Sequence, residues 1–467
     1  MTREIKQISG KKRNLMMAVL LFGAFVALLA ETFLNNALPT IMAAFGVSQS
    51  TAQWLTTAYL LVVGLMIPMS AWIFESFSMK QNYLTMMGIF FIGSIICVFA
   101  PNFYVLLTGR IIEAIAAGGL MPFIQNVILM MFPPEKRGMA MGITGLVIGF
   151  GPAVGPTISG LILKYSGWQM LFIILSVTSG LVALLAIFTV QNITTPHMST
   201  TDVISFLESI FGFGLILYAL SEIGNTGKIT FTLALIFIIG LVVIYLFCRR
   251  QLHLEEPLLD IRVFKNWQFN LCTLLSTISN LAMVGIELVL PLYLQTTRGE
   301  TALTSGLVMM PGALLMIICN PISGTLYDKL GIKKLSLFGF AMLVLGTVPM
   351  LTFRAQTSLV MIGICYALRM VGISFTMMTT FTAGINQVQS SMTAHANAGS
   401  STIRQIGGSL GTALAMLVVT IGSANAGVNK AAALATGYHW GFILMLIFAV
   451  IGLIGSFGLP TAKEENK

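Results

Sequence analysis

Long runs of apolar residues, separated by short polar segments, fill almost the whole chain. A transmembrane helix needs about 20 mainly apolar residues, and the chain contains fourteen such runs. The predicted spans lie at 15–44, 51–74, 83–100, 104–131, 138–163, 168–190, 202–223, 229–248, 267–297, 302–327, 335–353, 358–388, 396–424 and 436–459. The first run continues through Glu31, Asn35 and Pro39 in place of a small-residue cleavage site, which predicts a retained span. The pattern therefore predicts an all-α membrane protein with fourteen transmembrane helices.

Composition supports this prediction and excludes several classes of function. Of the 467 residues, 56% are apolar and 9% are charged, whereas about 25% are charged in ordinary soluble domains. The five cysteines form no C-x-x-C pair, and no phosphate-binding G-x-x-x-x-G-K-[ST] loop is present. We therefore expect no metal, no cofactor and no ATP site. A membrane-embedded enzyme or a receptor is disfavoured, because neither a cluster of His and acidic residues nor a large extramembrane domain is present.

The basic residues predict the orientation, because Lys and Arg concentrate in cytoplasmic loops. With an even number of spans, 17 of the 25 basic residues fall on the side of the two termini. Five fall on the opposite side, and the other three, Arg110, Arg369 and Arg404, lie within apolar spans. Both termini are predicted to be cytoplasmic. The net charge of +9 follows from this bias and indicates no nucleic-acid partner.

The chain contains an internal repeat. At an offset of 253 residues, Pro68-Met-Ser70-Ala71-x-x-x-Glu75 aligns with Pro321-Ile-Ser323-Gly324-x-x-x-Asp328. At an offset of 256, Gly151-x-x-x-Gly155 aligns with Gly407-x-x-x-Gly411. A parallel repeat of this kind predicts two six-helix bundles that meet at a central pathway. We assign residues 1–190 to the first bundle, 191–250 to two extra helices, 251–266 to a cytoplasmic linker, and 267–467 to the second bundle with a short tail.

A run of glycines and prolines interrupts the fifth span. Gly costs about 1 kcal/mol and Pro about 3 kcal/mol in a helix interior, so the run indicates close packing against neighbouring helices. A simple packing seam or kink is a sufficient explanation. The run consists of Gly145, Gly149, Gly151, Pro152, Gly155 and Pro156.

Together with a duplicated loop signature, this run resembles a known family. Gly324-x-Leu-x-Asp328-x-x-Gly331-x-Lys333-Lys334 is similar to the cytoplasmic loop of the major facilitator superfamily, and the run at 145–156 resembles the antiporter motif of its fourteen-spanner drug:proton antiporters. In the loop, Asp328 and the lysines could form charge pairs that lock one conformational state, although a solvated turn would explain the same residues. The first copy departs from the pattern, with Ala71, Glu75 and Ser78 in place of Gly, Asp and Gly.

The resemblance implies a multidrug efflux protein of the cell membrane that confers antibiotic resistance. Its expected partners are protons, bilayer lipid and a hydrophobic, often cationic substrate, and it is expected to act as a monomer by alternating access. A secondary transporter of an endogenous metabolite, lipid or peptide is the alternative.

Charged residues within the spans are the candidate site residues. Arg110 is expected to pair with Glu113, three residues away on one helical face, or with an acid on another helix. Snorkelling to an interface is the alternative. Arg369 lies similarly in the second half. The proton-coupling candidates are Glu31, Glu287, Glu113 and Glu222, because a carboxylate buried in a span is expensive unless it is protonated or paired. By the repeat, Glu31 and Glu287 are expected to face the central cavity. In the family that the chain resembles, the acid of the first span lies one residue earlier, at the position of Ala30. For each of these acids, a structural pair with a basic residue is the alternative.

Methionine-rich stretches at 120–123 and 375–378 offer a further alternative. Core packing explains them, but Met adapts to varied ligands and could line a pliable cavity.

Overall fold

The computed structural model describes residues 10–193, 202–424 and 430–461, except for the side chains of Asn35, Gln49, Ser50, Pro152, Ala153, Pro156, Thr157, Ala302 and 430–432. The fourteen long helices of this part are α1 (Gly10–Phe45), α2 (Gln49–Ser76), α3 (Met79–Val98), α4 (Phe103–Met131), α5 (Pro134–Tyr165), α6 (Gln169–Thr189), α7 (Val203–Thr226), α8 (Phe231–His253), α9 (Trp267–Leu292), α10 (Ala302–Leu330), α11 (Ile332–Thr347), α12 (Leu359–Asn386), α13 (Thr393–Ala424) and α14 (Lys430–Ser456). Short helical turns are η1 (Ile261–Lys265), η2 (Tyr293–Thr297), η3 (Val348–Thr352) and η4 (Ser390–Met392).

The prediction of an all-α membrane protein is confirmed. Thirteen of the described helices are long and apolar enough to cross a membrane. Helix α5, whose side chains are described only in part, is not among the thirteen. Most helix ends lie within a few residues of the predicted spans; the first span begins earlier, at Gly10, and the last begins at Lys430 and not at 436.

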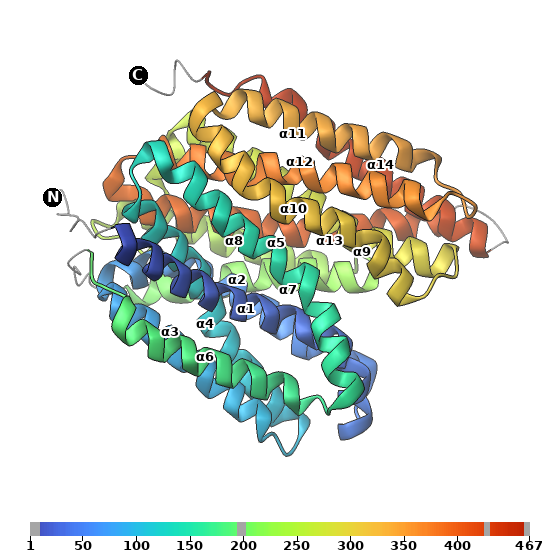
Figure 1. Ribbon diagram of the computed structural model, residues 1–467, viewed down its shortest axis with the longest axis horizontal. Helices are drawn as coiled ribbons and strands as arrows, with labels where there is room; N and C mark the ends of the chain where they lie inside the picture. Colours follow the sequence, from blue (N-terminus) through green and yellow to red (C-terminus); the bar gives the residue numbers. More distant parts are fainter. Residues whose placement is uncertain (1–9, 194–201, 425–429, 462–467) are drawn as a thin grey trace.

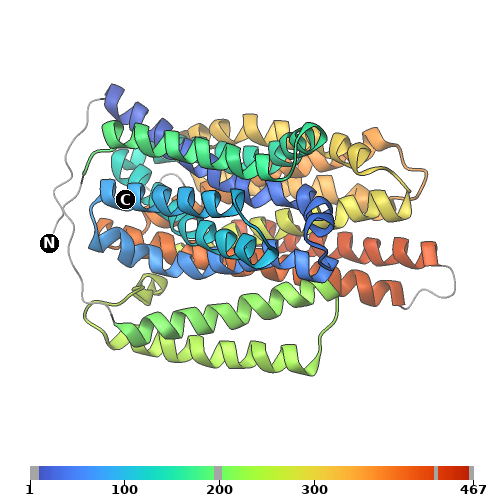
Figure 2. The ribbon, with the colours of Figure 1, turned by 90° about the horizontal axis from the view of Figure 1, so that it is seen from below.

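The helices lie side by side along the long axis of the molecule, and the start of α1 and the end of α14 lie at the same end of it (Figures 1 and 2). We call this end, where α1 begins and α14 ends, the terminal face. Helices α1–α6 pack mainly among themselves, as do α9–α14; we call these groups the N-terminal and C-terminal bundles. The main contacts between the bundles run from α5 to α10 and from α2 to α13.

Glycines on α5 form the seam with α10. A Cβ atom added to Gly142 would lie 2.6 Å from the backbone oxygen of Asn320, and one added to Gly149 would lie 3.2 Å from Met316. Asn320 Nδ2 also donates to the backbone oxygen of Gly145 across 2.8 Å. The backbones approach closely because no side chain separates them.

A second set of α5 glycines packs within the N-terminal bundle. A Cβ atom added to Gly151 would lie 2.7 Å from Leu28 Cβ, and one added to Gly155 would overlap the side chain of Thr32. The predicted close-packing function of the run is therefore present at Gly151 and Gly155, with α1 as the partner helix. The side chains of Pro152 and Pro156 lie outside the described residues.

Helices α7 and α8 form a separate pair beside the bundles, visible in green below them in Figure 2. Helix α7 contacts α13 of one bundle and α2 of the other, whereas α8 packs mainly on α7. The pair is clamped at the terminal face by Arg250 on α8, whose Nε and Nη2 donate to the Asp202 carboxylate across 2.5 and 2.9 Å. These hydrogen bonds hold the pKa of Asp202 well below its ordinary range, so the clamp stays ionised at physiological pH.

Candidate functional site

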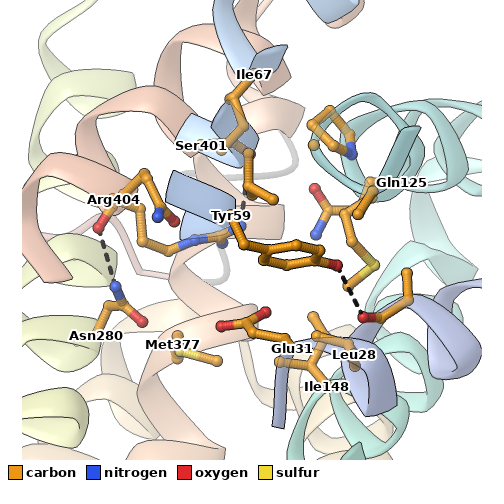
Figure 3. A pocket seen from close by; sticks show the side chains of 17 residues that line it. Leu28, Glu31, Tyr59, Ile67, Gln125, Ile148, Asn280, Met377, Ser401 and Arg404 are labelled. Carbon is orange, nitrogen blue, oxygen red and sulfur yellow. Dashed lines mark hydrogen bonds between the residues drawn. The ribbon is translucent and has the colours of Figure 1, made fainter. Parts of the chain in front are cut away.

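A cavity of about 150 Å³ lies between the two bundles. Helices α1, α2, α4 and α5 line one side of it, and α9, α12 and α13 line the other. One carboxylate and one guanidinium face it, together with side-chain amides and hydroxyls (Figure 3). Its polar lining residues are Glu31, Tyr59, Gln125, Asn280, Ser401, Arg404 and Gln405.

Glu31 is the acid that lines this cavity. It lies on α1 between Leu28 and Thr32, the residues against which the α5 glycines pack. Among the described residues, Glu31 has no hydrogen-bond or ion-pair partner, and Arg110 is the cation that acts on it electrostatically. An acid without a partner in a cavity between the bundles can exchange a proton for another cation.

Arg110 and Glu113 form a fully buried ion pair within the N-terminal bundle. Arg110 Nη1 lies 2.6 Å from Glu113 Oε2, with 1% and 0% of the two side chains exposed. Ser94 donates to the other carboxylate oxygen across 2.6 Å, and the Tyr59 ring lies 4.0 Å below the Arg110 guanidinium. The expected pairing is present, and the snorkelling alternative for Arg110 is wrong because the side chain is buried and paired.

Replacing one partner of this pair should destabilise the protein. Glu113→Gln would leave a buried Arg110 without its counter-charge, and breaking a buried pair in this way costs about 3–5 kcal/mol. We expect a clearly lower thermal-unfolding temperature in detergent. The exposed Arg354 provides a matched loss of one charge, and Arg354→Gln should unfold at the wild-type temperature. A Glu113→Gln protein as stable as wild type would contradict a structural role for the pair.

Arg369 is the counterpart of Arg110 in the C-terminal bundle, but it lacks an acidic partner. Its side chain is fully buried and donates to Thr347 Oγ1 and, across 2.9 Å, to the backbone oxygen of Ala282. Gly372 stands three residues later, where the first bundle has Glu113. In the described residues the Arg369 Nη atoms donate to neutral oxygens on α11 and α9, and its buried Nε has no partner.

Two of the predicted acids lie outside the cavity lining. Glu287 is half-buried on α9, two helical turns beyond the cavity-lining Asn280, and is near enough to Glu31 for their charges to repel. Glu287 is not among the residues that line this cavity, and its expected position facing the central pathway stays a prediction. Glu222 is half-buried near the end of α7, in the separate helix pair.

The second loop signature forms a contact between the bundles at the terminal face. Asp328, at the end of α10, accepts hydrogen bonds from the backbone N–H groups of Gly138 and Met139, each across 2.9 Å. These donors are the fifth and sixth residues of α5, near the positive end of the helix dipole, which favours an anion. Next to them, Arg137 Nη1 donates to Asn386 across 2.9 Å.

Two predictions for this loop, the charge pairs of Asp328 with the lysines and the turn at Gly331, have different outcomes. The expected charge pairs with Lys333 and Lys334 are wrong for the described residues: Asp328 is bound by the N-terminus of α5, not by the lysines. Gly331 suits its predicted turn, because its φ of +76° at the junction of α10 and α11 favours glycine.

The first loop signature makes a different contact. Glu75, at the end of α2, lies 3.3 Å from His395 Nε2 in the first turn of α13. Deeper on the same side, Asn397 Nδ2 on α13 donates to Asn126 Oδ1 and to the backbone oxygen of Pro122 on α4, each across 2.7 Å. The hydrogen bonds and the Glu75–His395 contact described here join the bundles at the terminal face.

Several cavity residues were not singled out from the sequence. Arg404 was noted only as a basic residue within a span, although a charge at that depth is by itself a sign of function. Gln125 and Asn280 could not be identified as cavity residues from the sequence, because a single side-chain amide in a helix is common. Met121 and Met377 line the cavity, which supports the alternative of a methionine-lined site for these two residues.

Comparison with known proteins places this architecture in a family. The sequence profile of the Major Facilitator Superfamily matches residues 20–416. An uncharacterized MFS-type transporter, YcnB of Bacillus subtilis, is 41% identical over 97% of this chain and 96% of its own length. The lincomycin resistance protein LmrB of Listeria monocytogenes is 35% identical over 96% of each chain.

A solved structure supports the same fold. The crystal structure of the human organic anion transporter MFSD10 matches with a TM-score of 0.67 at 12% identity, covering 94% of this chain and 99% of that chain. With a central cavity between two helical bundles and a family profile over most of its length, this chain is a multi-pass membrane transporter of the Major Facilitator Superfamily.

Proposed function

We propose that this transporter is a proton-coupled antiporter that exports hydrophobic, often cationic drugs or toxic compounds. The observation that supports this most directly is Glu31, a carboxylate without a partner among the described residues, in a cavity that both bundles line. Ionised and unpaired, such an acid costs several kcal/mol in a membrane interior. It therefore binds either a proton or a cationic ligand, and this competition couples the two fluxes.

The terminal face is the cytoplasmic face in this proposal, because the basic residues concentrate there. Asp328 on the α5 N-terminus and Glu75 on His395 then hold the bundles together on the cytoplasmic side. Export requires these contacts to separate so that the cavity can admit a substrate from the cytoplasm. The two bundles then move as units and part at the terminal face between α5 and α10.

Similarity to lincomycin resistance proteins supports a drug as the exported compound. Transport of an endogenous metabolite, lipid or peptide is the alternative. Expression in an efflux-deficient host, challenged with a panel of dyes and antimicrobials, distinguishes them: raised resistance to several unrelated compounds supports drug export, and unchanged resistance to all of them supports the alternative.

Removal of the carboxylate should uncouple export from the proton gradient. We expect Glu31→Gln to lose pH-gradient-driven efflux of a cationic dye from proteoliposomes. The purified variant should still bind the dye but should no longer release a proton when the dye binds. Glu287→Gln should reduce coupling less, because Glu287 lies outside the cavity lining. Glu222→Gln, in the separate helix pair, is the matched control and should transport at the wild-type rate.

The proposal that Glu31 couples the proton is contradicted by one clear result. If Glu31→Gln, Glu287→Gln and the double variant all drive efflux at the wild-type rate with substrate-induced proton release intact, the proton is exchanged elsewhere. The control variant Glu222→Gln would then be tested for loss of coupling, and the paired Glu113 would be the next residue to replace.

A further inference from the structure

The cavity presents two opposite charges that are not paired with each other. Glu31 enters from α1 of the N-terminal bundle, and Arg404 from α13 of the C-terminal bundle; Figure 3 shows both side chains directed at the same space. No ion pair joins them in the described residues, although both line one small cavity. Each charge is therefore available to a group that the protein itself does not supply.

Arg404 retains unused hydrogen-bond donors. Its guanidinium lies 4.9 Å from the centre of the Phe381 ring, and Nη2 makes a long hydrogen bond of 3.4 Å to Ser401 Oγ. Its Nη1 is buried and has no acceptor among the described residues. The backbone of Arg404 is held in place by Asn280, whose Nδ2 donates to the Arg404 carbonyl oxygen across 2.9 Å. A positioned guanidinium with free donors suits a carboxylate, which it can bind in a bidentate manner.

Gln125 gives an independent sign of a ligand. Its side chain is 1% exposed and is directed into the cavity (Figure 3). Neither its Nε2 nor its Oε1 has a partner among the described residues. A buried amide left without hydrogen bonds is costly, and a ligand with polar groups would satisfy it.

The apolar part of the lining suits the body of such a ligand. Ile67, Met121, Ile148 and Met377 surround the polar groups. A volume of about 150 Å³ is suited to a small aromatic or aliphatic body. Ligand pockets commonly combine such an apolar wall with a few placed polar groups.

We propose that the cavity binds a small zwitterionic amphiphile, whose acidic group contacts Arg404 and whose cationic group contacts Glu31. Such a ligand bridges α13 and α1 and so connects the two bundles, whereas a purely cationic ligand uses only the N-terminal half of the site. The proposal identifies the class of substrate that the exporter would carry. Only the direction of transport rests on the proposed function.

Three matched compounds test the proposal on the purified full-length protein in lipid nanodiscs. 4-(Aminomethyl)benzoate has both charges, 4-methylbenzylamine only the cation and 4-methylbenzoate only the anion. Wild-type protein should bind the zwitterion about tenfold more tightly than either single-charge compound, measured by equilibrium dialysis of the radiolabelled compounds. Arg404→Gln should weaken binding of the zwitterion about tenfold and leave the amine unchanged. Glu31→Gln should weaken the zwitterion and leave the benzoate unchanged.

The amine serves as an internal control for folding of the Arg404 variant. If Arg404→Gln cannot be purified, Arg404→Lys retains the charge but not the bidentate geometry, and should weaken the zwitterion severalfold. The proposal is overturned if wild-type protein binds zwitterion and amine equally. It is also overturned if Arg404→Gln weakens binding of the amine as much as binding of the zwitterion. Arg404 would then stabilise the structure of the site without contacting the ligand. The assay uses no proton gradient, so a failure of proton-driven export leaves its result unchanged.

Discussion

Gly155→Leu should abolish export while the protein remains inserted in the membrane. A single Cβ atom at Gly155 already overlaps the side chain of Thr32 on α1, and Leu adds three further carbon atoms. Overpacking of this kind costs about 1–3 kcal/mol, which the protein can survive. However, α1 must move away from α5, and Glu31, the neighbour of Thr32, moves with it. Dye efflux from cells should fall to the level of cells without the transporter.

Gly160, on the same helix, provides the matched control. A Cβ atom there would meet Asn36 Nδ2 at 3.8 Å, an ordinary contact, and the residue is exposed. Gly160→Leu should therefore export at close to the wild-type rate, with equal amounts of both variants on a membrane immunoblot. Undiminished efflux by Gly155→Leu would show that α1 tolerates displacement, and equal losses in both variants would show a general defect of α5.

Asp328→Asn should slow turnover by about tenfold or more. The carboxylate accepts two backbone hydrogen bonds from the positive end of α5, and hydrogen bonds to a charged group contribute about 1.5–3 kcal/mol. The Asn side chain has one acceptor oxygen and no charge, so the closed terminal face loses stability relative to the open one. We expect the variant to bind substrate but to return slowly to the closed state, measured as the steady-state rate in proteoliposomes.

Glu75→Gln is the corresponding change in the first loop signature, and its effect should be mild. Glu75 contacts an imidazole at 3.3 Å, which is a charge pair only when His395 is protonated. An amide preserves a hydrogen bond to the neutral ring. Equal slowing by Asp328→Asn and Glu75→Gln would contradict the inference that the two bundles differ in how they close.

The fold was predictable because each span is long enough to be recognised without its partners. The buried pair of Arg110 and Glu113 was also predictable, since both residues lie on one helical face. Contacts between distant helices could not be predicted. Asp328, for example, binds backbone amides of α5, and every residue type except proline has such a backbone donor, so the sequence does not indicate it. Arg404 and Glu31 are separated by 373 positions in the chain. Their common cavity depends on how the bundles rotate against each other, which the apolar pattern does not encode.

The placement of α7 makes the two lateral borders of the cavity unequal. On one border, α7 spans from α2 to α13 and inserts Leu217 against Gly64, so lipid acyl chains are kept away from that side. On the other border, α5 and α10 meet directly, and their contact depends on glycine and on the Asp328 hydrogen bonds. A compound dissolved in the leaflet at the terminal face would therefore enter sideways between α5 and α10 once those bonds part, and its route from the bilayer would be one-sided.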